Sequence, residues 1–164
     1  MTDSEGLQRA YNEDKKVYVD GNKLYVAGTS NLRDVWDDLK IPLKLTRYSQ
    51  RYKDADEVLK SNPQVESITG HSLGGAVSLE LNKNNNNKYK ISTYGAPVFQ
   101  WGNQKSDNVR FRHPGDIVSM FDNGAIPVTN NILKNTVSPI TNHTFEQYMD
   151  TGKESSTSLN PQIM

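Results

Sequence analysis

The sequence contains no cysteine among its 164 residues. This absence excludes disulfide bonds, zinc sites built on thiolates and thiol redox chemistry, so packing must stabilise the fold. An excess of one charge is also missing, because 19 Lys and Arg residues balance 19 Asp and Glu residues. Without a basic stripe, nothing in the composition supports nucleic-acid binding.

Long hydrophobic runs are missing as well. No segment approaches the roughly twenty apolar residues that a membrane-spanning helix needs. Residues 1–16 are polar and acidic, and they lack the apolar stretch of a signal peptide. Together with the absence of cysteine, this predicts an intracellular or particle-associated protein. Secretion stays open, because a leader peptide could have been removed.

The most informative segment present is Gly70–Gly74, which has the pattern Gly-x-Ser-x-Gly. An apolar run over 65–69 predicts a strand before it, and residues 73–81 predict a helix after it. At such a sharp strand-to-helix turn, Ser72 is forced into a strained conformation that pushes its hydroxyl out above the sheet. Flanking glycines avoid collisions with the neighbouring strand and helix. The pattern therefore predicts a nucleophilic serine.

The rest of the chain predicts further strands and helices, with no repeat and no domain boundary. We expect a hairpin over 15–27 that turns at Asp20-Gly21-Asn22. The Asn- and Lys-rich segment 82–87 is predicted to be a solvated loop. The remaining predicted elements are helices over 30–39 and 48–61, and strands over 89–94 and 109–113, the last with one face open to water.

A serine hydroxyl needs a base to remove its proton, and the chain has three histidines: His71, His113 and His143. His71 adjoins the serine, and we expect its side chain to point away from the hydroxyl. Between Ser72 and His143, Asp116 follows a Pro-Gly turn after the last predicted strand. Hydrolases with such sheets order their triad as Ser, then Asp or Glu, then His, which Ser72, Asp116 and His143 satisfy. Taken singly, Asp116 could be a turn residue and His143 a surface histidine.

Acyl transfer also needs hydrogen-bond donors where the carbonyl oxygen becomes negative. One predicted donor is the backbone N–H of Leu73, directly after the serine and at the positive end of a helix dipole. The resemblance of the segment 25–39 to a known family implies that the other donor is the N–H of Thr29, with its hydroxyl as a further candidate. The segment 28–30 could instead turn the chain and cap the following helix, and the two roles are compatible.

Taken in order, these segments resemble the class 3 lipases, the α/β-hydrolases that include the secreted fungal triacylglycerol lipases. The resemblance spans roughly residues 17–148. Its segments are the nucleophile motif 68–76, the following strand and turn 93–97 with 102–103, the acid-bearing strand 109–118, the histidine block 142–148 and the oxyanion segment 25–39.

The resemblance implies a compact α/β-hydrolase fold, with a central, mostly parallel sheet flanked by helices and a nucleophile elbow. Residues 1–150 would form a single minimal domain, and residues 151–164 a polar C-terminal tail. The catalytic residues would be Ser72, Asp116 and His143, with the oxyanion hole at Thr29 and Leu73. Neither a metal nor an organic cofactor is implied.

Several positions depart from the family pattern. Ala27 replaces an arginine, Trp36 is shifted by one position, the Pro-Arg-Val-Gly run is broken over 97–102, and a His-x-Gly-Phe motif is missing at 43–48. These departures concern the acyl pocket and the lid and leave the triad assignment unchanged. An apolar stripe within 31–43 resembles the family's lid, but it would serve equally well as a core face.

The expected function is serine-dependent hydrolysis of carboxylic esters of acyl lipids, of the triacylglycerol lipase or esterase type, through an acyl-enzyme. The expected partner is an acyl-ester lipid, which such an enzyme meets at a membrane or lipid-droplet surface. A phospholipase, a thioesterase or an acyltransferase would use the same triad with a different pocket. A non-catalytic structural or binding protein on a lipase scaffold is the remaining alternative.

Overall fold

The computed structural model describes residues 1–29, 44–96, 109–112 and 126–127. In this part of the chain, the strands form one sheet in the order β1-β2-β3-β4-β5-β6. Neighbouring strands from β2 to β6 are parallel, and β1 is antiparallel to β2. The elements are α1 (Asp3–Asn12), β1 (Val17–Asp20), β2 (Lys23–Val26), α3 (Lys44–Ser61), β3 (Ser67–His71), α4 (Leu73–Asn84), β4 (Lys90–Tyr94), β5 (Val109–Arg112) and β6 (Ile126–Pro127). The predicted α/β class with a mostly parallel sheet is confirmed.

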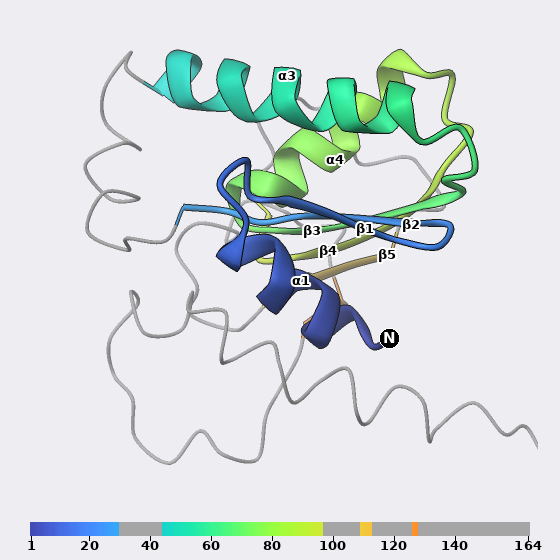
Figure 1. Cartoon of the computed structure of the whole chain (residues 1–164). Helices are drawn as coiled ribbons and strands as arrows, with labels where there is room; N and C mark the ends of the chain where they lie inside the picture. Colours follow the sequence, from blue (N-terminus) through green and yellow to red (C-terminus); the bar gives the residue numbers. More distant parts are fainter. Residues whose placement is uncertain (30–43, 97–108, 113–125, 128–164) are drawn as a thin grey trace, which may run out of the picture.

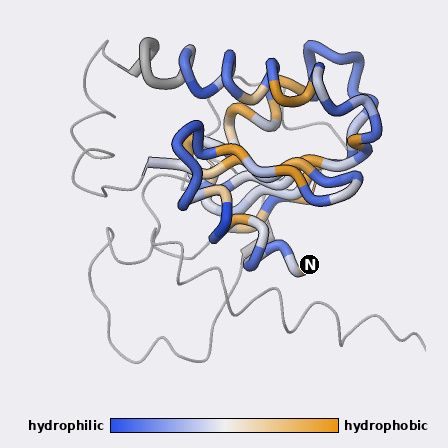
Figure 2. The backbone as a smooth tube through the Cα atoms, in the orientation of Figure 1, coloured by the Kyte–Doolittle hydropathy of each residue, from blue (hydrophilic) through white to orange (hydrophobic). Residues whose placement is uncertain are grey.

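Helices cover both faces of the sheet. Helices α3 and α4 lie on one face and α1 lies on the other (Figure 1). Strand β2 shows why both faces are covered: Leu24 and Val26 enter the core under α3 and α4, whereas Tyr25 and Ala27 enter the core under α1. Figure 2 shows hydrophobic stretches along the sheet and along the helix surfaces that face it. A parallel sheet buried on both faces is typical of α/β proteins.

The predicted hairpin is confirmed. Asp20 pairs with Lys23, so Gly21 and Asn22 form a two-residue turn. Gly21 has φ +56°, a left-handed conformation that such hairpin turns require and that glycine adopts without a Cβ clash. The carbonyl of Asn22 accepts from the N–H of Glu66 at 2.8 Å, which joins the turn to the start of β3.

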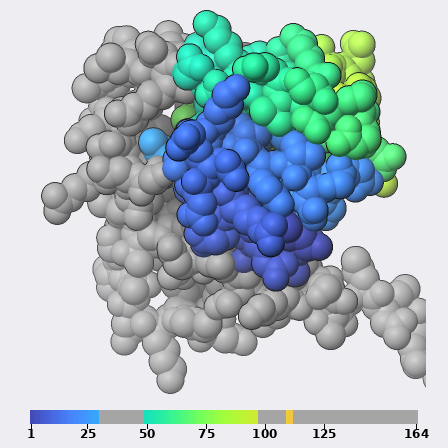
Figure 3. All heavy atoms as spheres, in the orientation of Figure 1, coloured from blue at the N-terminus to red at the C-terminus, as the bar shows by residue number. Residues whose placement is uncertain are grey.

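Helix α3 begins at Lys44, before the predicted position 48, and ends at Ser61 as predicted. Its Ala55 and Leu59 are buried in the core, as the apolar spacing indicates. On the exposed side, Lys15 forms a 3.0 Å ion pair with Glu57 of the helix. Figure 3 shows the N-terminal residues in blue lying against α3 in green on this face of the molecule. The predicted helix over 30–39 lies outside the described residues.

The predicted solvated loop over 82–87 is wrong in its first half. Helix α4 continues to Asn84, and Asn82 is fully buried. The side-chain oxygen of Asn82 accepts from the backbone N–H of Tyr89 at 2.9 Å, so a buried amide ties the helix end to the start of β4. Asn86 and Asn87 then adopt positive φ, which asparagine tolerates better than most residues.

The predicted strand over 109–113 is found as β5, Val109–Arg112, but exposure along it runs opposite to the polarity of its residues. Arg110 is 3% exposed, whereas Val109 is 40% exposed. Strand β5 pairs with β4 on one side and β6 on the other, so it is an internal strand of the described sheet. Along β5, a charged residue is therefore buried and an apolar residue is exposed, the opposite of what residue polarity predicts.

Helix α1 and strand β6 were not predicted from the sequence. Helix α1 begins with a capping box between Thr2 and Glu5 and buries Leu7 against the sheet. Near its N-terminus, Asp3 accepts a 3.2 Å hydrogen bond from the hydroxyl of Tyr94 on β4. Burial, and next the charge of Asp3, raise the pKa of Tyr94, so this phenol stays protonated and remains a donor.

Candidate functional site

Ser72 is the single residue between the end of β3 and the start of α4. Its backbone has φ 54° and ψ −126°, and its side chain makes no capping hydrogen bond to the helix. A serine that caps a helix has extended backbone angles and bonds to the first-turn N–H groups. Helix capping therefore does not explain Ser72. A positive φ at a non-glycine residue costs about 1–3 kcal/mol and marks a position that the surroundings hold in place.

Backbone hydrogen bonds hold this turn against the sheet. The N–H of Ser72 donates to the carbonyl of Tyr94 at the end of β4, at 2.9 Å. The carbonyl of Ser72 accepts from the N–H groups of Gly75 and Ala76 at 2.9 and 3.3 Å, which starts the helix. Ser72 is 3% exposed. Its conformation is thus fixed by both the neighbouring strand and the following helix.

Glycines permit the close approach of α4 to the sheet. A Cβ at Gly70 would lie 2.5 Å from the carbonyl oxygen of Gly74. A Cβ at Gly74 would collide with the carbonyl of Val26 on β2, and one at Gly75 would lie 2.6 Å from the Cβ of Ala96. The expectation that glycines here avoid collisions with strand and helix is confirmed.

The segment after β2 runs directly beside the turn. A Cβ built at Gly28 would lie only 2.8 Å from the Cβ of Ser72. Thr29 follows Gly28 and is half-buried, and Leu73 is the first residue of α4 and also half-buried. The first N–H groups of a helix have no partner within the helix. Three predicted site residues, Ser72, Leu73 and Thr29, therefore belong to two segments that meet at one place.

His71 is 2% exposed, and its Nδ1 lies 2.6 Å from the hydroxyl of Tyr11 on α1. The same hydroxyl accepts from the N–H of Gly28 at 3.1 Å. Tyr11 was not among the predicted site residues, because α1 was not predicted. The capping box Thr2–Glu5, followed by the apolar positions Leu7 and Ala10, was the signal that could have revealed this helix.

Asp116 and His143, the other predicted members of the triad, lie outside the described residues. The same holds for His113 and for the predicted lid over 31–43. Their assignments stay predictions.

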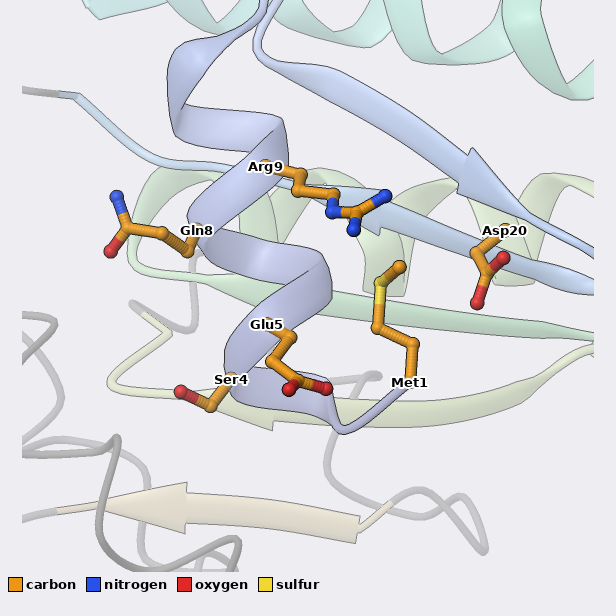
Figure 4. A pocket seen from close by; sticks show the side chains of 6 residues that line it. All are labelled: Met1, Ser4, Glu5, Gln8, Arg9 and Asp20. Atoms are coloured by element: carbon orange, nitrogen blue, oxygen red, sulfur yellow. The ribbon is translucent and has the colours of Figure 1, made fainter.

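One open hollow of about 630 Å³ lies beside α1 (Figure 4). Its lining side chains are polar except for Met1, and none belongs to the turn around Ser72. Arg9 in this hollow is held by Tyr18, whose hydroxyl it contacts at 2.9 Å. The lining residues are Met1, Ser4, Glu5, Gln8, Arg9 and Asp20.

Two features are absent from the described residues. No cluster of His, Cys, Asp and Glu suited to a metal ion occurs among them. Nor does any helix there combine the length and the apolar character that crossing a membrane requires.

The strained backbone at Ser72 leads to a prediction about stability. The free energy of unfolding of Ser72→Gly should be about 1 kcal/mol larger than that of Ser72→Ala. Glycine adopts positive φ without a Cβ clash, and this gain exceeds the extra backbone entropy that glycine loses on folding. Both variants lack the hydroxyl, so the comparison isolates the backbone. Urea denaturation monitored by circular dichroism measures it. An alanine variant as stable as the glycine variant would show that the backbone at this position is not strained.

The described part thus defines an α/β protein with a strained serine between a central parallel strand and a helix. No family model matches the chain, and no curated protein matches it. Among solved structures, it is similar to the crystal structure of the Lip2 lipase from Yarrowia lipolytica, with 23% sequence identity and a TM-score of 0.43. The match covers 70% of this chain and 59% of that lipase, so the chain spans less than two thirds of its length. A similarity at this level carries no argument about activity.

Proposed function

We propose that this protein is a serine hydrolase that cleaves carboxylic esters of acyl lipids, with Ser72 as its nucleophile. The observation that carries the proposal is the backbone of Ser72, with φ 54° and ψ −126° at a strand-to-helix junction. This conformation is characteristic of a nucleophile elbow, in which strain presents a serine hydroxyl at the top of a sheet. The close contacts at Gly70 and Gly74 support the same interpretation, because they allow the helix to start directly after the serine.

The proposed reaction proceeds in two halves. The Ser72 hydroxyl attacks the ester carbonyl while His143 removes its proton, and Asp116 orients the imidazole and stabilises its charged form. The alcohol leaves with a proton from His143, and an acyl-enzyme remains. Water, activated by His143, then attacks the acyl-enzyme and releases the fatty acid.

The topology supports Asp116 as the acid. The ends of β3, β4 and β5 are aligned, since His71 pairs with Tyr94 and Tyr94 pairs with Phe111. Strand β5 therefore ends at the same edge of the sheet as β3, about 10 Å away across two strand spacings. Asp116 comes four residues after Arg112, and four extended residues span up to about 13 Å. A carboxylate at this position can reach the neighbourhood of Ser72 through a histidine.

The oxyanion that forms during attack would be stabilised by two backbone donors. The N–H of Leu73 lies at the start of α4, where the helix dipole is positive. The second donor is the N–H of Thr29, on the segment that Gly28 brings against Ser72. Losing one such donor typically costs about 3–4 kcal/mol of transition-state stabilisation.

The proposal is tested with an alkyl fluorophosphonate, which labels activated serines covalently, and with p-nitrophenyl esters from acetate to palmitate. We expect one adduct, mapped by mass spectrometry to the peptide that contains Ser72, and hydrolysis that rises with acyl-chain length. Since Ser72 is 3% exposed, the labelling rate also reports how readily a substrate reaches it. An adduct on a different serine, or no adduct and no hydrolysis, would refute the proposal.

A further inference from the structure

The hydroxyl of Tyr11, near the C-terminal end of α1, contacts both segments that meet at Ser72. It lies 2.6 Å from Nδ1 of His71 and accepts from the N–H of Gly28 at 3.1 Å. His71 directly precedes Ser72, and Gly28 directly precedes Thr29. A single oxygen atom on a helix therefore joins the β3 side and the β2 side of the proposed site.

The Tyr11 hydroxyl makes this link just beyond the point where the pairing of β2 with β3 ends. The last paired residues of β2 and β3 are Val26 and Gly70. Beyond them, the two segments continue to Thr29 and Leu73, whose N–H groups are proposed to bind the same oxygen. Such donors must be held within about 0.5 Å of their productive separation. The Tyr11 hydroxyl connects the two segments within this stretch.

Burial makes the link difficult to replace. His71 is 2% exposed and Gly28 is also buried, so water cannot readily take over the hydrogen bonds that Tyr11 makes. The rings of Tyr11 and His71 are 5.9 Å apart and tilted by 60°. At its other end, α1 is held to β4 by the bond between Tyr94 and Asp3. The position of the Tyr11 hydroxyl is thus set by a helix whose other end is attached to the sheet.

We propose that Tyr11 is a positioning residue: through His71 and Gly28, it fixes the separation between the N–H groups of Leu73 and Thr29. Tyr11 itself contacts neither the substrate nor the reacting atoms. This inference rests on the proposed function, because it assigns a role to Tyr11 within the same site. A residue that only attached α1 to the sheet would affect the stability of the protein and leave turnover by the folded protein unchanged. A positioning residue also affects turnover.

The test is Tyr11→Phe in the full chain, which removes one oxygen atom and keeps the ring. We expect kcat for a p-nitrophenyl ester to fall about 10- to 100-fold with KM nearly unchanged. The reason is that displaced donors stabilise the transition state less and leave the binding of the substrate unchanged. The Ki of an alkyl trifluoromethyl ketone, which forms a tetrahedral adduct with a nucleophilic serine, should rise by the same factor. Thermal unfolding measures the accompanying change in stability.

The matched control is Tyr18→Phe, which removes a hydroxyl that Arg9 of the same helix contacts at 2.9 Å, away from the turn. Its kcat and Ki should equal those of the wild type. If Tyr11→Phe loses stability but keeps its kcat and Ki, the positioning role is refuted while the proposed function stands. If the wild type itself neither hydrolyses esters nor reacts with the fluorophosphonate, both proposals fail.

Discussion

Ser72→Ala is expected to lower kcat/KM for ester hydrolysis by at least about 10⁴-fold, because removing a triad nucleophile leaves only binding and oxyanion stabilisation. The loss should appear in kcat, since the hydroxyl acts in the transition state. The fold should persist, because the hydroxyl makes no capping bond to α4. Hydrolysis of p-nitrophenyl esters and circular dichroism spectra of the same samples measure both quantities.

Combining this change with a change at the proposed base makes the test sharper. Groups that act as a unit are strongly non-additive, so Ser72→Ala with His143→Ala should be no slower than either single variant. The kcat of Asp116→Asn should also be lower than that of the wild type by orders of magnitude, because the imidazole loses its orienting partner. The control is Ser61→Ala, at the exposed end of α3, which should retain full activity. Additive losses would show that His143 does not act on Ser72.

Local patterns predicted most of the described fold. The turn at Gly21, the apolar face of α3 and the end of α3 at Ser61, two residues before Pro63, each follow from short-range rules for turns, amphipathic helices and proline. The strand, serine and helix around Gly70–Gly74 were predicted together, because the motif combines a steric requirement with a defined position between two elements. Prediction succeeded where one physical constraint acts within a few neighbouring residues.

The failures arise where tertiary packing decides the outcome. Asn82 has a low helix propensity, yet the buried hydrogen bond from the N–H of Tyr89 keeps it in α4. Arg110 is buried although it is charged, and the sequence of its strand does not reveal this. Helix α1 carries a local start signal in its capping box, but its place on the sheet depends on Tyr11 and Asp3, whose partners are far away in the sequence.

The sequence locates the segment that carries Ser72 more directly than the segment that carries Thr29. Ser72 and Leu73 lie next to each other in the sequence, so one motif locates both. Thr29 was named from the sequence only through a family resemblance, and the structure adds the physical reason, because the register of Val26 with Gly70 places the segment after β2 beside the turn. Tyr11 carries no motif at all. Its relation to the site depends on where a helix lies across the sheet, and only the fold determines that.

Gly74→Ala is expected to destabilise the protein by about 3 kcal/mol. Its Cβ would collide with the carbonyl of Val26, and backbone atoms cannot rotate away as a side chain can. Overpacking of this kind costs about 1–3 kcal/mol and occasionally more. Alanine is better than glycine within a helix by about 1 kcal/mol, so propensity alone predicts the opposite sign. The sign of the change therefore decides between local propensity and packing.

The same collision should also lower the rate of ester hydrolysis. Moving α4 away from β2 changes the distance between Leu73 and the segment that carries Thr29, so we expect kcat to fall about 100-fold. Gly21→Ala is the matched control: its Cβ would have no neighbour within 4 Å, but its φ of +56° is unfavourable for alanine. It should lose about 1–2 kcal/mol of stability and keep its kcat. Urea denaturation and ester hydrolysis measure both variants. If Gly74→Ala were as stable and active as the wild type, α4 would not need its close contact with β2, and the steric account of this motif would be wrong.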